Sequence, residues 1–322
     1  MDFLFYKYLS KSCANKIAKG LHLPELYDMH NVDQQCTFVN SNTTNRYIYE
    51  RLLSGDPFFV GRIGGTEMTI LRDYIVTTHV LGKPHIRKKL VNRLSTLSGF
   101  FPEDVVLVSK FAETTINAVK EIDLLALWWG GYESYLAEKY ASNAKYTKLP
   151  LIEPWQTGVE VPWSAALEGK NVLVIHPFEE SIKHQYQKRQ YLFEGSNILP
   201  EFNLKTVKAV QTIAGQQDTR FDTWFDALQY MYEEAMKIDF DVAIVGCGAY
   251  GFPLSAMLKS AGKQAIHLAG ATQILFGIKG KRWESEENFG YLHPWFNEHW
   301  SYPLDVDVPQ GAGIVEGGCY WK

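Results

Sequence analysis

Short runs of apolar and β-branched residues alternate with longer amphipathic stretches along most of the chain. The short runs predict strands, and the stretches in which apolar residues recur every three or four positions predict helices. The predicted strands lie at 57–65, where the strand runs into a glycine-rich turn, and at 123–129, 171–177, 203–210, 241–246 and 264–268. The predicted helices lie at 44–54, 66–75, 84–97, 103–119, 222–237, 252–262 and 271–278, and another follows residue 177. This alternation indicates an α/β fold, Rossmann-like, with a parallel sheet covered by helices on both faces.

The same pattern divides the chain into three segments. We expect an N-terminal helical segment at 1–43, an α/β domain at 44–283 and an irregular C-terminal wrap at 284–322. The last segment is rich in aromatic residues, proline and glycine, which is typical of irregular structure rather than of a separate module. No repeat or low-complexity linker interrupts the chain.

Composition narrows the class of protein. The chain has 322 residues, of which 46% are hydrophobic, so it can bury a sizeable core. A formal net charge of −4 gives no general attraction to nucleic acid, and no nucleic-acid partner is expected. The four cysteines lack C-x-x-C spacing, which is typical of reduced thiols in a cytoplasmic protein. No apolar run approaches the roughly 18 residues that a membrane span needs.

The first 23 residues combine aromatic side chains with four lysines. Lys7 and Lys11 interrupt the apolar run, so the segment does not have the core of a signal peptide. A helix that lies at a membrane surface has this composition, and so does a helix packed on its own domain. Both interpretations stay open here, and any membrane contact is expected only through residues 1–20.

A first candidate site is the stretch 246–251, which has G-x-G-x-x-G spacing between a predicted strand and a predicted helix. Gly246, Gly248 and Gly251 permit a tight turn and a close approach of backbone to a ligand. Tyr250 could stack on a ring or donate a hydrogen bond. A nicotinamide site also needs an acid about 20 residues later, yet no Asp or Glu occurs between Asp241 and Glu284. No nicotinamide cofactor is therefore expected, and the turn either binds another phosphate or simply lets strand and helix pack.

A second glycine turn, GRIGGTE at 61–67, follows the first predicted strand. Arg62 could pair with a phosphate, and the amides at Gly64, Gly65 and Thr66 could hold it at a helix start. Glu67 could act as a base or ligate a divalent metal ion. The competing interpretation is a carboxylate that stabilises the first turn of a helix through the helix dipole.

Two further strand ends carry polar residues. His176 ends the strand at 171–177, and Ser181 lies in the helix start after it, where it could hold a phosphate or serve only as a cap. Thr272 begins the segment after the last strand, and Lys279 and Arg282 belong to a basic cluster there. That cluster suits a phosphate-binding loop, although a solvated run of charge has the same composition. Because ligands of open α/β sheets bind at the carboxyl ends of strands, these residues predict one shared site.

The turn GRIGGTE resembles the R-[FI]-G-[DG]-x-E signature of the GT-D-type nucleotide-sugar glycosyltransferases. The order of the later parts is similar too: the strand and polar helix start VLVIHPFEES, an amphipathic helix after 217–225, and VAIVGCGAYG with its helix and small strand. The resemblance covers residues 45–283. The segments GATQILFGIKGKRW and VEGGCYW also resemble proteins encoded among surface-polysaccharide genes.

The resemblance implies a GT-D-like parallel α/β sandwich that transfers a sugar from a nucleotide-sugar donor to a glycan or glycoconjugate acceptor. It also implies a divalent cation, Mn²⁺ or Mg²⁺, held through an Asp-x-Glu pair. The Glu of that pair is Glu67, but Gly65 stands where the family has Asp. Either another acid completes the metal site, with Asp73 and Glu180 as candidates, or cationic side chains replace the metal. Arg62, Lys279, Lys281 and Arg282 would then neutralise the leaving diphosphate.

Two other functions remain open at this point. One is an NAD(P)-linked oxidoreductase that uses the turn at 246–251, and the other is a nucleotide- or glycan-binding protein without catalysis. The absence of Asp at position 65 is the best support for the second. The donor base, the sugar, the linkage and the oligomeric state do not follow from the residues.

Overall fold

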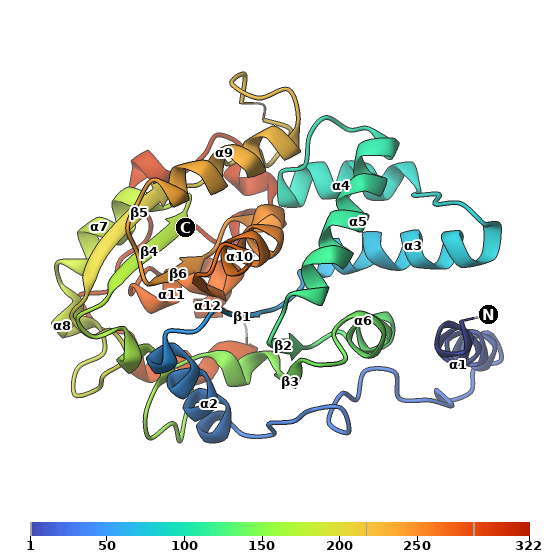
Figure 1. Ribbon diagram of the computed structural model, residues 1–322, viewed down its shortest axis with the longest axis horizontal. Coiled ribbons are helices and arrows are strands. Elements are labelled where there is room, and N and C mark those ends of the chain that lie inside the picture. Colours follow the sequence, from blue (N-terminus) through green and yellow to red (C-terminus); the bar gives the residue numbers. More distant parts are fainter. Residues whose placement is uncertain (1, 217, 286) are drawn as a thin grey trace.

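Within residues 2–216, 218–285 and 287–322, which the computed structural model describes, seven parallel strands form one sheet (Figure 1). The strands are β1 (Phe58–Gly61), β2 (Leu124–Leu127), β3 (Lys145–Lys148), β4 (Asn171–His176), β5 (Asn203–Lys208), β6 (Val242–Val245) and β7 (Gln264–His267). Their order across the sheet is β3-β2-β1-β7-β6-β4-β5. The parallel sheet confirms the predicted α/β fold of Rossmann-like character.

Helices cover both faces of this sheet, because successive strand side chains point to opposite sides. Phe59, for example, belongs to one core, while its neighbours Phe58 and Val60 belong to the other. The first core is closed by α3 (Gly65–Leu81), α4 (Lys88–Ser98), α5 (Val105–Lys120), α6 (Tyr132–Tyr140), α9 (Trp224–Met236) and α10 (Gly251–Ser260). The second is closed by α2 (Ser41–Ser54), α7 (Glu179–Tyr186), α8 (Arg189–Leu192), α11 (Thr272–Leu275) and α12 (Lys281–Ser285).

The chain leaves neighbouring strands toward opposite faces at two places in the sheet. After β1 it enters α3 on the first face, whereas after the adjacent β7 it enters α11 on the second. The adjacent pair β6 and β4 repeats this arrangement with α10 and α7. Such reversals leave a crevice at the carboxyl ends of the strands, where ligands of open α/β sheets bind.

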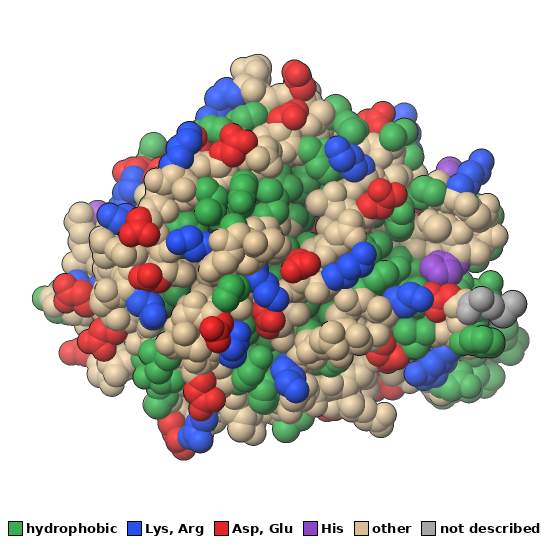
Figure 2. Space-filling model, in the orientation of Figure 1, with side chains coloured by type: hydrophobic (Ala, Val, Ile, Leu, Met, Phe, Trp, Pro, Cys, Tyr) green, Lys and Arg blue, Asp and Glu red, His purple; other side chains and the backbone are tan. Residues whose placement is uncertain are grey.

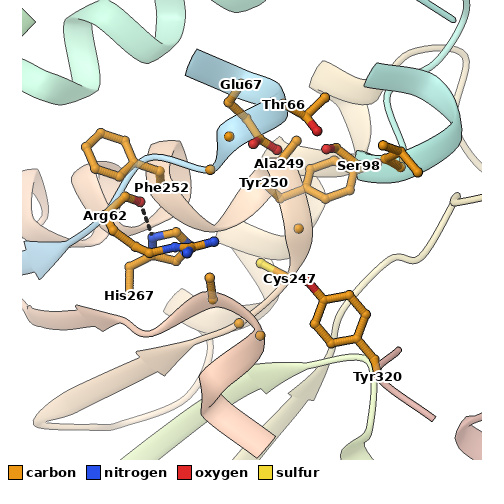
Figure 3. Close-up of a pocket in the computed structure, with 18 of the residues that line it drawn as sticks. Arg62, Thr66, Glu67, Ser98, Cys247, Ala249, Tyr250, Phe252, His267 and Tyr320 are labelled. Carbon is orange, nitrogen blue, oxygen red and sulfur yellow. Dashed lines mark hydrogen bonds between the residues drawn. The ribbon is translucent and has the colours of Figure 1, made fainter. Parts of the chain in front are cut away.

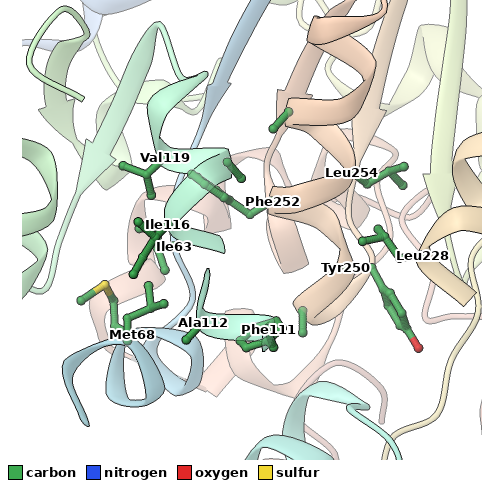
Figure 4. Close-up of a cluster of buried hydrophobic side chains, with 14 of the residues drawn as sticks. Ile63, Met68, Phe111, Ala112, Ile116, Val119, Leu228, Tyr250, Phe252 and Leu254 are labelled. Atoms are coloured by element: carbon green, nitrogen blue, oxygen red, sulfur yellow. The ribbon is translucent and has the colours of Figure 1, made fainter. Parts of the chain in front are cut away.

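Helix α5 fixes the relative position of the two helices that follow the glycine turns. Phe111 and Ile116 of α5 lie between Met68 of α3 and the α10 side chains Phe252 and Leu254 (Figure 4). All five side chains are buried. Burying a side chain of this size stabilises a fold by about 1.5–3 kcal/mol. The N-termini of α3 and α10 are therefore held in a fixed geometry by packing.

Several elements are absent from the sequence prediction, among them helix α6 and strand β3. Helix α6 buries Glu133 as well as Tyr135 and Leu136, so its buried face does not follow an apolar pattern. Strand β3 has the sequence Lys-Tyr-Thr-Lys and lies at one edge of the sheet, where only Thr147 is fully buried. Apolar periodicity does not reveal elements of this kind.

The N-terminal segment is a helix docked on the rest of the chain. Helix α1 (Phe3–Gly20) packs on α6 through Phe5 and Tyr8. Asp2 caps it by accepting from the amide of Phe5 at 3.0 Å, and it also accepts from the Tyr135 hydroxyl at 2.9 Å. Among the described helices, none combines the length and the apolar composition that crossing a bilayer demands.

The C-terminal segment after α12 consists of short 3₁₀ turns, namely Glu287–Trp295, Asp305–Asp307, Ala312–Ile314 and Glu316–Gly318. The aromatic residues Trp300 and Trp321 pack into the second core. Asp307 fastens this segment to α7, because its buried carboxylate accepts from the Ser181 amide at 2.7 Å and from the Ser181 hydroxyl at 2.6 Å.

Replacing Asp307 should loosen this attachment. Asp307→Ala leaves two buried donors of Ser181 without an acceptor, so the free energy of unfolding should fall by roughly 2–4 kcal/mol. Urea denaturation measures the change, and Asp305→Ala, two residues away and exposed, is the matched control with an expected effect within about 0.5 kcal/mol. Equal effects of the two variants would contradict a fastening role for Asp307.

Candidate functional site

A cavity of about 690 Å³ opens at the carboxyl edge of the sheet. Its walls come from the segments that follow the seven strands, from α5, from the end of α4 and from the C-terminal segment. Figure 3 shows side chains from several of these segments facing a common space. A volume of this size is typical of pockets that enclose small-molecule ligands.

Arg62 projects from the end of β1 into this cavity (Figure 3). Its guanidinium carbon lies 5.1 Å from the ring centroid of Trp128. Its Nε atom is buried, and within the described ranges neither a hydrogen bond to Nε nor an ion pair to Arg62 is found. A planar cation that rests on an indole without a carboxylate partner is prepared to bind an anion such as phosphate.

His267 supports the backbone of Arg62 at the end of the adjacent strand. Its Nδ1 atom lies 3.0 Å from the Arg62 carbonyl oxygen, and because a carbonyl only accepts, Nδ1 carries the proton. Burial, together with the charge of Arg62, lowers the pKa of His267 to about 3, so the ring is neutral. A Cβ atom at Gly251 would lie only 2.4 Å from Nε2. The last glycine of the G-x-G-x-x-G stretch is thus needed to make room for this ring.

Two helix N-termini face the cavity. Helix α3 follows the N-cap residue Gly64, helix α10 begins at Gly251, and neither has a side-chain hydrogen bond at its cap. The segments 64–67 and 246–250 both line the cavity. The first amides of a helix lack carbonyl partners four residues earlier and carry the positive end of the helix dipole. Together with Arg62, they give this edge of the sheet the electrostatics of a phosphate or diphosphate site.

The Asp-x-Glu metal pair that the resemblance implies does not fit at residues 65 and 67. A Cβ atom at Gly65 would lie 3.0 Å from Cζ3 of Trp129 and 3.1 Å from Cη2 of Trp128, so the indoles fill the space of an acidic side chain. The Glu67 carboxylate turns back toward its own helix start, where a Cβ atom at Gly64 would lie 2.0 Å from its Oε2 atom. Across the described part of the chain, no cluster of three or more His, Cys, Asp or Glu residues could hold a metal ion.

Neither candidate replacement acid joins Glu67 in the cavity. Asp73 forms a two-point ion pair with Arg87, with both N–O distances at 2.7 Å. Glu180 is exposed and pairs with Lys183 at 2.9 Å. The structure thus places both residues in local ion pairs away from Glu67.

Trp128 and Trp129 form a rigid aromatic wall after β2. The Oε2 atom of Glu133 accepts from three successive amides, those of Trp128 at 3.0 Å, Trp129 at 2.7 Å and Gly130 at 3.1 Å. The indole of Trp128 donates to the Ile63 carbonyl at 2.9 Å. Both tryptophans remain about one-third exposed, at 37% and 36%. A fixed pair of part-exposed rings suits stacking on a base or a sugar face.

Glu153 is a second carboxyl group in the cavity wall. Its Oε2 atom accepts from the Tyr291 hydroxyl at 2.7 Å, from Gln156 at 2.8 Å and from the Trp155 indole at 3.1 Å. Burial raises the pKa of Glu153 to about 7, although these hydrogen bonds and the charge of Arg62 oppose the rise. A carboxyl group that titrates near neutrality inside a cavity is able to exchange protons with a ligand.

Most of the predicted site residues meet in this cavity. Those that line it are Arg62, Gly64, Gly65, Thr66, Glu67, His176, Gly246, Gly248, Tyr250 and Arg282. Those outside its lining are Ser181, Gly251, Thr272 and Lys279. Ser181 is bound to Asp307, Thr272 is buried beneath the turn at Gly246, and Lys279 pairs with Glu284 at 3.2 Å. These three side chains therefore serve local packing or ion pairing rather than the cavity surface.

Three residues of the lining are already engaged with the protein. Tyr250 stacks on Trp224, with ring centroids 4.8 Å apart, so that face is not free to stack on a ligand. His176 accepts from the Phe178 amide at 3.0 Å, and burial lowers its pKa to about 3. Arg282 donates to the Tyr320 hydroxyl at 2.9 Å and pairs with Glu316. Arg62 is therefore better placed than Arg282 to bind an anionic ligand.

Sequence reasoning missed Trp128, Trp129, Glu153 and Tyr320 as cavity residues. The two tryptophans stand at the carboxyl end of a predicted strand, and that position was a usable signal. Glu153 follows a polar edge strand that was itself not recognised, so no pattern pointed to it. Tyr320 reaches the cavity only because the C-terminal segment folds back, and its ring meets the space above Gly270, where a Cβ atom would lie 2.5 Å from Cε1.

No family model, no curated protein and no solved structure matches the chain. The function is therefore inferred from the geometry of the cavity and from the sequence motifs that line it.

The titration of Glu153 predicts a pH dependence of stability. Because the pKa in the folded chain, about 7, is above the ordinary value of 4.5, the folded state binds more protons between these values. The free energy of unfolding of the chain should therefore fall as pH rises from about 4.5 to about 7. Glu153→Gln should remove this contribution to the pH dependence of stability. Unfolding measured between about pH 5 and pH 8 tests this, with the exposed Glu168→Gln as control. An unchanged slope in Glu153→Gln would sink the prediction.

Proposed function

We propose that the chain is a glycosyltransferase of the GT-D type, which moves a sugar from a nucleoside diphosphate sugar to a hydroxyl group of a glycan or glycoconjugate. The observation that carries the proposal is Arg62, a cation without a carboxylate partner that shares one cavity with the N-termini of α3 and α10. The resemblance of the turn at 61–67 to the family signature supports the same assignment.

The donor's diphosphate would lie against the amides at 64–66 and 247–249, with Arg62 beside it, because the amides of Gly246 and Tyr250 already donate to the carbonyls of Ile175 and Cys247. Trp128 and Trp129 would stack on the base or on the sugar. The acceptor oxygen would then form a bond to the anomeric carbon while the bond from that carbon to the diphosphate oxygen breaks. Negative charge grows on the leaving diphosphate in this step, and Arg62 and the helix amides would stabilise it.

A carboxylate is needed to take the proton that the acceptor hydroxyl loses. Glu67 opens α3 beside the amides of the anion site and is the proposed base. Glu153 lies in the same cavity and would be a second ionisable group near the reacting atoms. No step in this scheme passes through a metal ion, because the space of an Asp at position 65 is filled by the two tryptophans.

A nucleotide-binding protein without catalysis is the second candidate, and the filled space at Gly65 is what favours it. It predicts the same binding and no turnover. The oxidoreductase alternative has less support, because β7 ends in the neutral His267 instead of the acid that would hold a ribose.

Binding should depend on Arg62. In thermal-shift measurements with UDP-, GDP-, CMP- and dTDP-sugars, one donor at 100 times its dissociation constant should stabilise the chain by about 2.7 kcal/mol. Arg62→Met should weaken that binding by about tenfold or more, since a charge-assisted contact is lost. Arg46→Met, at an exposed arginine of α2, is the control. NAD(H) and NADP(H) are tested in parallel, and a shift with them alone would replace this proposal by the oxidoreductase.

Turnover should depend on Glu67. Release of nucleotide from the donor that gives a thermal shift, with water or a mixed oligosaccharide pool as acceptor, should fall about 100-fold or more in Glu67→Gln while donor binding persists. Glu50→Gln, at an exposed position of α2, is the control, and each assay is repeated with Mn²⁺, Mg²⁺ or EDTA. Full turnover by the Gln variant would remove Glu67 from the mechanism. Binding without turnover in every variant and metal would identify the non-catalytic protein.

A further inference from the structure

Helix α1 has two different apolar faces. Phe5, Tyr8 and Ala18 face inward and are buried against the rest of the chain. On the opposite side, positions 3, 6, 10, 13 and 17 recur at helical spacing, and this stripe carries Phe3, Tyr6 and Ile17 in exposed positions. Phe3 is 79% exposed and Ile17 is 64% exposed, so nothing in the described chain covers this second face.

The exposed apolar surface continues beyond the end of the helix. Leu21, Leu23 and Leu26 are exposed by 64%, 55% and 63%. Leu23 stays attached to α1, because its amide donates to the Ala18 carbonyl at 2.9 Å. Tyr27 is fastened to Asn15 through two hydrogen bonds, of 2.6 and 2.9 Å. The outer stripe of α1 and the segment 21–26 are called the outer surface of α1 below.

Positive charge predominates around the outer surface of α1. Lys7, Lys11, Lys16 and Lys19 lie along the helix, and no Asp or Glu occurs between Phe3 and Pro24. The chain as a whole has the opposite balance, with a net charge of −4. Two carboxylates lie close by: Glu138 is 3.8 Å from Lys7, and Glu25 lines a small pocket beside Lys16 and Lys19. Figure 2 shows blue Lys and Arg atoms beside green apolar atoms at the end of the molecule where α1 lies in Figure 1.

We propose that the outer surface of α1 docks on a membrane that contains anionic lipids. The exposed Phe3, Ile17 and Leu21 would enter the interface between headgroups and acyl chains, and the flanking lysines would lie against anionic headgroups. A second copy of the chain would bring the same lysines face to face, and their repulsion argues against it as the occupant. An anionic lipid surface satisfies both the apolar stripe and the positive charge.

Docking there would place a membrane beside the rim of the cavity. A small pocket of about 210 Å³ separates α1 from the turn after β2, and Trp129 lines both this pocket and the large cavity. His30, in the segment that follows α1, lies with its Nδ1 atom 2.8 Å from the Trp129 carbonyl. The amide of Gly131 donates to the Met29 carbonyl at 2.7 Å. Met29 and His30, which follow the outer surface of α1 in the chain, thus join that end of the molecule to the turn that carries Trp129.

Vesicle binding by the full chain tests the proposal. Co-sedimentation should show binding to vesicles that contain phosphatidylglycerol and weaker binding to pure phosphatidylcholine, and salt should reduce it. Lys7→Gln with Lys16→Gln should weaken the binding about thirtyfold, whereas Lys88→Gln with Lys89→Gln, at exposed positions of α4, should leave it unchanged. Phe3→Ser with Ile17→Ser should also abolish binding, and Val106→Ser with Val306→Ser is the control at equally exposed apolar sites.

Cys13 gives a local readout on the same stripe. It is exposed, Cys36 is half-buried, and Cys247 and Cys319 are buried, so a polarity-sensitive fluorophore can be attached to Cys13 in a Cys36→Ser background. Its emission should shift to the blue when vesicles with anionic lipid are added. Absence of vesicle binding would overturn the proposal. So would concentration-dependent dimers that Phe3→Ser with Ile17→Ser abolishes, since a second copy would then be the occupant.

Discussion

The parallel direction of all seven described strands is the constraint on which the site depends. It brings the carboxyl end of every strand to one edge of the sheet, so residues far apart in sequence meet there without any local signal. Arg62 and His267 are 205 positions apart, yet they are neighbours because β1 and β7 pair in register. The chain leaves β1 and β7 toward opposite faces of the sheet, and likewise β4 and β6, which leaves a crevice at that edge.

Glycine residues permit close packing at this edge of the sheet because they have no Cβ atom. A Cβ atom at Gly246 would lie 2.5 Å from the Thr272 hydroxyl, and one at Gly251 would lie 2.4 Å from the His267 ring. Both positions have ordinary backbone angles, so it is close packing and not a left-handed conformation that requires glycine there. The glycines of the G-x-G-x-x-G stretch therefore make room for the buried ring of His267 and for Thr272 at the start of α11. This packing role explains why the stretch occurs without the acid of a dinucleotide site.

The sequence was sufficient for features that depend on local pattern. Apolar runs located six of the strands, and the polar and glycine residues at their carboxyl ends located Arg62 and the two helix starts in one cavity. The sequence was insufficient where tertiary contacts determine the burial or the orientation of a side chain. Glu133 is buried because three backbone amides bind it, and Ser181 points to Asp307 because the C-terminal segment folds back over α7. Burial raises the pKa of Glu153, whereas the hydrogen bond from Tyr291 of the C-terminal segment partly opposes that rise.

The charges at the cavity account for how a diphosphate would be neutralised without an Asp-x-Glu metal pair. A divalent ion needs several oxygen ligands, and an acid at position 65 would have to displace two indoles that Glu133 and the Ile63 carbonyl hold in place. The same indoles give Arg62 a surface on which its planar cation rests, 5.1 Å from the Trp128 centroid. Tryptophan at this wall thus excludes the acid and positions the arginine. If a diphosphate binds here as proposed, Arg62 and the two helix N-termini would be the groups that neutralise its charge.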